Sequence, residues 1–211
     1  AVEQLAGLGL LATLTKANVP NLASNVDGQF LGKYFDPGNT YSVPYVWGTA
    51  GIGYDSSKLA TAPTSWAVLW DESLSGEINM LGDSRETFGV ALKRLGYSIN
   101  ESDPARIAEA QAMLIAQKPL VYSYETETDA LMQSKQVTVT HAWNGDVLRV
   151  AKEQPEWKYV VPDEGGTIFI DNLAIPKATQ HQALAESLLD YLLRPDVIAQ
   201  ITLFTQYANC V

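Results

Sequence analysis

The feature that most constrains the fold of this chain is an alternation of strand-like and helix-like segments from residue 41 to residue 205. Runs rich in Val, Ile, Thr and aromatic residues predict strands at 41–54, 78–81, 120–124, 137–142, 159–161 and 167–171. Apolar residues three and four positions apart predict helices near 63–75, 88–96, 104–117, 183–193 and 195–205. Connections of this length imply crossover helices, so the sequence predicts an α/β fold with a largely parallel sheet.

The net charge and the composition of the chain argue against several classes of binding partner and cofactor. Fourteen Lys and Arg against twenty-four Asp and Glu give a net charge of −10, which disfavours nucleic acid as a partner. A single cysteine and two histidines cannot build a Cys/His metal cage, and no cofactor motif is present. The longest apolar run, near residues 5–14, is interrupted by Gly and Thr and falls short of the roughly 18 residues of a membrane span.

Two acids follow the strand predicted at 78–81. Asp83 and Glu86 are three positions apart at a predicted helix start, which places both carboxylates on one face of the first turn. One interpretation is a capping box, in which Asp83 caps the helix and Glu86 reaches back to it. The other is a pair of ligand-binding acids beyond the carboxyl end of a strand, where α/β sheets bind ligands. This segment alone favours the cap.

A tryptophan and an acid follow the strand predicted at 137–142. Trp143 at this tip could hold an alkyl-ammonium group by cation–π attraction, with Asp146 neutralising the charge. The alternative is that Trp143 closes one end of the core while Asp146 caps the next helix. Both interpretations remain open at this point. The neighbouring His141 is expected to be a hydrogen-bonded strand residue rather than a base, and His181 to begin a helix.

A third acid ends the strand predicted at 167–171. Phe169 and Asp171 alternate along this strand and therefore share one face. A buried carboxylate is costly without a partner, so Asp171 needs a backbone donor, a salt bridge or a cationic ligand. Paired carboxylates beside aromatic side chains are also found in glycoside hydrolases, so such an enzyme using Asp83, Glu86 or Asp171 is the rival interpretation.

Nine segments in this order resemble the bacterial spermidine/putrescine-binding proteins, the extracytoplasmic receptors of polyamine ABC importers. The matching segments are residues 34–39, 41–49, 64–66, 83–86, 95–97, 143–146, 164–166, 171–176 and 192–197. The resemblance implies a periplasmic-binding-protein-like two-lobe fold of type II. It also implies that the chain is an interior fragment, with one lobe incomplete and a signal peptide in the longer parent.

The resemblance assigns parts of the chain to the two lobes. Residues 1–54 would form part of lobe one, 55–165 lobe two and 166–206 the return to lobe one. Residues 207–211 would begin a second hinge crossing. A hinged pair of lobes would close around the ligand.

The resemblance also assigns ligand-binding residues. Asp171 matches the family's central amine-binding carboxylate, with Phe169 as its aromatic neighbour, and Asp83 and Glu86 match the acids of lobe two. Three further positions match the family's site: Trp143 an aromatic slab, Asp146 an acid of the putrescine-preferring branch, and Tyr207 a hinge-side tyrosine. Some members have Trp at the position of Phe169, and residues 208–210 lack the usual proline turn, which leaves the preferred polyamine open.

The expected function is therefore a non-enzymatic receptor that captures putrescine or spermidine and delivers it to the membrane permease of an ABC transporter. Neither a cofactor nor a metal is expected, and the receptor should be monomeric. The expected location is the periplasm, or the outer side of the cytoplasmic membrane if the parent is a lipoprotein. The alternatives are a receptor for another small cation or metal, and a carbohydrate-active hydrolase.

Overall fold

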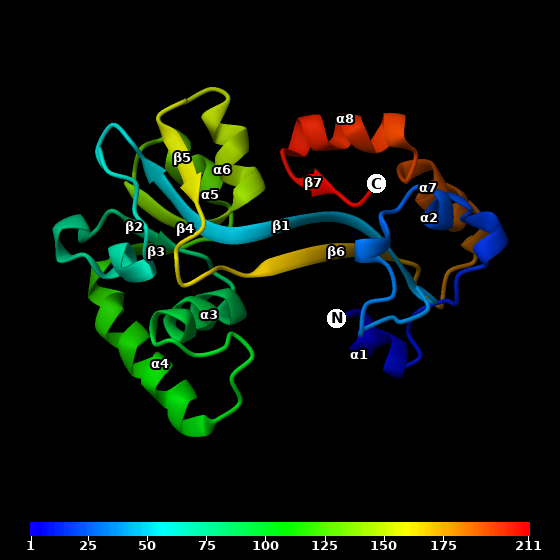
Figure 1. The fold of residues 1–211 in the computed structure, drawn as a ribbon, viewed down its shortest axis with the longest axis horizontal. Helices are drawn as coiled ribbons and strands as arrows, with labels where there is room; N and C mark the ends of the chain where they lie inside the picture. The colour runs from blue at the N-terminus through cyan, green and yellow to red at the C-terminus, as the bar shows by residue number, and fades with distance from the viewer. The chain divides into compact units, whose positions relative to one another are not determined.

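The computed structural model describes residues 1–211, which divide into two compact units. Unit 1 comprises Ala1–Trp47 and Phe169–Val211, and unit 2 comprises Gly48–Ile168. The chain changes unit after residues 47 and 168, and the family resemblance predicts lobe boundaries after residues 54 and 165. The first change falls inside strand β1 (Ser42–Asp55), the long cyan strand of Figure 1, where composition gives no signal. The assignment of these units to lobes stays a prediction.

Unit 2 is built on a sheet with the strand order β3-β2-β4-β1-β5. Its strands besides β1 are β2 (Ile78–Met80), β3 (Val121–Tyr124), β4 (Val139–Trp143) and β5 (Trp157–Val160). Its α-helices are α3 (Ser84–Arg94), α4 (Pro104–Gln117), α5 (Thr128–Gln133) and α6 (Asn144–Ala151). Short 3₁₀ helices occupy Trp66–Trp70, Glu72–Leu74 and Lys118–Leu120. The predicted strands of this region and the helices predicted at 88–96 and 104–117 are confirmed within a few residues. The helix predicted near 63–75 is instead a pair of 3₁₀ helices, and α5 and α6 have no counterpart among the helix ranges predicted from the sequence.

The prediction of a largely parallel sheet holds for the direction of β2, β3, β4 and β5, and β1 is the exception. Strand β2 is parallel to β3 and β4, but β1 is antiparallel to β4, β5 and the short strand β7 (Ala208–Asn209). Helix α6 does connect two strands of the same direction, β4 and β5, as a crossover helix should. Strand β1, from another part of the sequence, lies between them. Local sequence patterns reveal a crossover but not a strand inserted into it.

The core of unit 2 lies on both faces of this sheet. One face packs Ile52, Ile78 and Val139 against Trp66 and Leu69 of the first 3₁₀ helix. The other face packs Val147 and Val150 of α6 against Met132 and Trp157. Strand β2 is buried along its whole length, and its one polar residue, Asn79, donates to the Glu125 carbonyl and to Thr140 Oγ1. The segments around Asp83 and Trp143, which lie at the carboxyl ends of β2 and β4, are therefore anchored to buried strands.

Unit 1 is poorer in regular structure, as its Gly, Pro, Asn and Asp content predicts. Its α-helices are α1 (Val2–Gly7), α2 (Asn21–Ser24), α7 (Gln182–Leu192) and α8 (Pro195–Thr205). Strand β6 (Ile168–Ala174) and β7 pair with β1, and 3₁₀ turns occupy Lys16–Asn18 and Gly28–Phe30. The core includes Val19, Val43, Ile175 and Leu193. No helix in the chain combines the length and the apolar character that spanning a membrane requires.

Candidate functional site

Asp83 is held at the start of α3, directly after the buried strand β2. Its Oδ1 atom accepts hydrogen bonds from the backbone amides of Arg85, at 2.8 Å, and Glu86, at 3.0 Å. This confirms Asp83 as the cap of α3. The cap fixes the orientation of the first helical turn, and Glu86 belongs to that turn.

Glu86 is a half-buried carboxylate that lacks a full set of partners. Its Oε2 atom is buried and accepts no hydrogen bond. Burial raises the pKa of Glu86, a side-chain hydrogen bond with Thr167 lowers it, and the nearby Asp83 charge raises it further. The neighbouring Arg85 donates instead to Asn100, at 3.0 Å. A carboxylate in this state favours the arrival of a cation that can donate hydrogen bonds.

Trp143 and Asp146 flank the start of α6 in unit 2. Trp143 is half-buried, ends strand β4 and occupies the position before the helix. Asp146 is largely buried and forms an ion pair with Arg149, with 3.1 Å between Oδ1 and Nη2. Asp146 therefore already faces a cation from its own helix, and its role toward an amine stays a prediction.

A polar network beside these residues escaped the sequence analysis. The backbone amide of Thr49 donates to Asn144 Oδ1 at 2.9 Å, and the Thr49 hydroxyl lies 2.8 Å from the Tyr159 hydroxyl. Asn144 adjoins Trp143 in the segment singled out by sequence, which was its only available signal. Thr49 and Tyr159 lie 110 positions apart, so only the pairing of β1 with β5 brings them together.

Unit 1 carries the three remaining predicted residues. The Phe169 and Tyr207 rings meet edge to face, with 5.9 Å between centroids and 69° between planes. Tyr207 follows Gln206, whose left-handed backbone (φ 63°) ends α8. Asp171 is exposed within unit 1, yet desolvation by the surrounding protein raises its pKa. Burial, with a contribution from the Asp171 charge, also raises the pKa of the Cys210 thiol to about 12.

His141 differs from its expected state. It is a buried residue of β4, as predicted, but neither ring nitrogen has a hydrogen-bond partner, so the expectation of a hydrogen-bonded side chain is wrong. Its ring instead meets the edge of Trp66, with 5.3 Å between centroids. Burial lowers the pKa of His141 to about 3. The imidazole is neutral and enclosed, which does not suit a general base.

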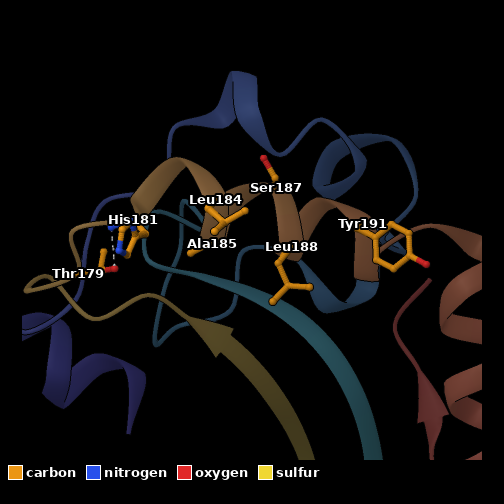
Figure 2. Close-up of a pocket in the computed structure, with 7 residues that line it drawn as sticks. All are labelled: Thr179, His181, Leu184, Ala185, Ser187, Leu188 and Tyr191. Carbon is orange, nitrogen blue, oxygen red and sulfur yellow. Dashed lines mark hydrogen bonds between the residues drawn. The ribbon is translucent and has the colours of Figure 1, made fainter.

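Unit 1 also has a hollow of about 570 Å³ along α7 (Figure 2). Its lining side chains are Thr179, His181, Leu184, Ala185, Ser187, Leu188 and Tyr191. None of these side chains is a carboxylate, and Leu184, Ala185 and Leu188 are aliphatic. This hollow does not have the chemistry expected for an organic cation, and it contains none of the predicted site residues.

Comparison with known proteins gives a consistent result. Residues 1–208 match the model of the family described as bacterial extracellular solute-binding protein. The chain is 35% identical over 202 residues to the spermidine/putrescine-binding periplasmic protein of Escherichia coli K12, covering 95% of this chain and 58% of that protein. It is 32% identical over 207 residues to a putrescine/cadaverine-binding protein of Pseudomonas aeruginosa PAO1, covering 92% of this chain and 58% of that protein.

The fold has a close counterpart among solved structures. The spermidine/putrescine ABC transporter substrate-binding protein of Streptococcus pneumoniae superimposes with a TM-score of 0.85 at 29% identity. The match covers 99% of this chain and 64% of that structure. This confirms the predicted α/β fold of the periplasmic-binding-protein type. The chain spans 58% of the length of both curated relatives.

Proposed function

The chain belongs to the bacterial extracellular solute-binding protein family, and we propose that it serves in the capture of polyamines such as putrescine and spermidine. The proposal extends to delivery of the polyamine to the permease of an ABC importer. The protein would act as a monomer in the periplasm, or as a lipoprotein outside the cytoplasmic membrane. It would bind its ligand without chemical turnover and without a cofactor.

The state of Glu86 is the observation that carries this proposal. The buried Oε2 atom has no hydrogen-bond donor, and burial raises the pKa of the carboxyl group. An ammonium group is both a cation and a hydrogen-bond donor, so it can donate to the unpartnered oxygen and also stabilise the charged form of this carboxylate. The names of the relatives support the same ligand class, since both refer to putrescine.

The other site residues fit a ligand made of ammonium groups on a methylene chain. Asp171, with its raised pKa, offers a second carboxylate, and no ion pair of the structure includes it. Trp143, Phe169 and Tyr207 supply aromatic surfaces, which suit methylene groups and attract ammonium groups through their π faces. Asp83 would act mainly by fixing the first turn of α3, since its Oδ1 atom caps that helix.

Titration calorimetry of the full protein with putrescine, spermidine, maltose and ferric citrate tests the proposal. We expect saturable binding of one polyamine per protein and no binding of the sugar or the iron complex. Incubation with a panel of glycans should release no product. Binding of maltose or ferric citrate with no response to polyamines would contradict the proposed ligand, and hydrolysis of a glycan would favour an enzyme.

A further inference from the structure

Two adjacent residues of β1, at the point where the strand enters unit 2, form hydrogen bonds with three residues from elsewhere in this unit. The Thr49 amide donates to Asn144 Oδ1 at 2.9 Å, and the Thr49 carbonyl accepts from the Tyr159 hydroxyl at 2.9 Å. The Ala50 amide donates to the Thr167 carbonyl at 2.9 Å. We refer to Thr49 and Ala50 as the β1 junction. Each of its three partners comes from a different part of unit 2.

Tyr159 is the most constrained partner of the junction. Its hydroxyl donates to the Thr49 carbonyl and also lies 2.8 Å from Thr49 Oγ1. The ring packs directly on Gly51, where a Cβ atom would come within 2.5 Å of the phenol oxygen. Burial, together with the nearby Glu86 charge, raises the pKa of Tyr159 to about 12. The Tyr159 hydroxyl therefore stays protonated at neutral pH and donates its hydrogen to the Thr49 carbonyl.

The junction connects two of the proposed ligand-binding residues. Asn144 directly follows Trp143, so its bond to Thr49 ties the start of α6 and the backbone of Trp143 to β1. Thr167 accepts from the Ala50 amide through its carbonyl, and its side chain lies close enough to the Glu86 carboxylate to lower its pKa. Trp143 and Glu86 are therefore each tied, through one intermediate residue, to neighbouring positions of the same strand.

We infer that the β1 junction fixes the spacing between the Trp143 ring and the Glu86 carboxylate, and thereby selects the methylene length of the diamine that binds. This inference rests on the proposed function and adds the basis of discrimination among polyamines. Tyr159 and Asn144 are positioning residues, because they act through Thr49 and the neighbouring site residues rather than through direct contact with the ligand.

The physical reason is that a diamine couples two contacts through a chain of defined length. With the ammonium group on Glu86, only one range of methylene number keeps the alkyl chain on the Trp143 ring. If the spacing is fixed, a diamine with one methylene more or fewer must give up part of one contact. One methylene in a shaped apolar site changes affinity by about 10- to 200-fold. A loosened junction would reduce this discrimination.

The test compares 1,3-diaminopropane, putrescine and cadaverine by titration calorimetry of the full protein. Tyr159→Phe removes the phenol oxygen from the junction, and Asn144→Ala removes the acceptor for the Thr49 amide. We expect each variant to reduce the affinity ratio between the preferred diamine and its neighbours in length by several-fold. The double variant should lose less than the sum of the two effects, because both side chains hold Thr49.

Two further variants keep the test decisive. Tyr122→Phe makes the same chemical change at an exposed tyrosine of β3 and should leave the ratio unchanged. Thr49→Val keeps the branched side chain while removing one hydrogen bond, so it gives a readout if the other variants do not fold. Circular dichroism and thermal unfolding check the fold of each variant.

The outcomes separate the inference from the function on which it rests. Wild-type protein that binds no diamine would overturn both the proposed function and this inference. Wild-type binding, with folded variants that weaken all three diamines by the same factor, would overturn the inference alone. A selective loss of discrimination in the Tyr159 and Asn144 variants would support it.

Discussion

At the residue scale, the environment rather than the residue type decides what each carboxylate does. Glu186 is almost fully buried, yet hydrogen bonds from Gln182, Thr15 and Asn18 outweigh the effect of burial and lower its pKa to about 2. Glu86 has one buried oxygen without a donor, and its pKa is raised. Glu186 therefore stabilises unit 1, whereas Glu86 has capacity left for a ligand.

Removing the charge of Glu86 or Asp171 should weaken polyamine binding. Glu86→Gln and Asp171→Asn each keep the shape of the side chain but replace a charge-assisted hydrogen bond with a weaker neutral one. We expect a loss of about 1.5 to 3 kcal/mol per substitution, measured by calorimetry with putrescine and spermidine. Asp196→Asn is a matched control, since Asp196 pairs with Arg194 on the exposed surface of α8. Unchanged affinity in either site variant would show that this acid does not bind the ligand.

At the element scale, strand β4 combines a structural and a functional task. Its last residue, Trp143, belongs to the proposed site, while His141, two positions earlier, faces Trp66 in the core. In the register of β4 with β1, His141 lies opposite Ile52 and Trp143 opposite Ala50. The packing of His141 in the core therefore helps to set the position of Trp143 at the end of the same strand.

His141 should make the stability of the protein depend on pH. Its pKa is about 3 in the folded protein and about 6.5 when unfolded, so the unfolded state binds more protons between these values. The free energy of unfolding should therefore fall as pH falls from 6.5 toward 3, by at most about 1.4 kcal/mol per pH unit from this residue. Denaturant unfolding of wild type and His141→Leu at pH 5 and 7.5 measures the difference.

The comparison with the second histidine isolates the effect. His181 is exposed before α7, so His181→Gln should show the same pH dependence as the wild type. His141→Leu should lose part of that dependence, and it removes no hydrogen bond because both ring nitrogens are unpartnered. Equal pH dependence in the wild type and the His141 variant would contradict a neutral, enclosed imidazole.

At the scale of the whole molecule, acidic side chains outnumber basic ones by ten. Ion pairs such as Lys58–Glu77 and Arg194–Asp196 are exposed on both sides, and such pairs contribute little to stability. The surplus of acid instead produces a negative field around the protein, which attracts organic cations over a distance set by the salt concentration.

The rate of polyamine association should therefore fall as ionic strength rises. Stopped-flow measurement of spermidine binding, using tryptophan fluorescence, should show slower association at 0.5 M than at 0.02 M NaCl. Spermidine should be more sensitive than putrescine because it carries one more charge. An association rate that is independent of salt would show that the net charge does not steer the ligand.

Local chemistry in the sequence was sufficient to predict most of the strands and the longer helices. Asp103 and Pro104 mark the start of α4, Pro195 marks the start of α8, and Asp83 caps α3 as its position predicts. These features depend on neighbours within a few positions, so the sequence contains the whole interaction. The family resemblance and the α/β fold follow from the order of such segments along the chain.

Only the tertiary structure decided the features that join distant segments. The insertion of β1 between β4 and β5, the missing partners of His141 and the contact of Thr49 with Tyr159 all depend on strand pairing over long separations. A hydrogen bond or its absence is set by which groups the fold brings within about 3 Å, and sequence spacing does not specify this for residues a hundred positions apart. The sequence thus determined which residues are candidates for binding an organic cation, and folding determined which hydrogen-bond and charge partners surround them.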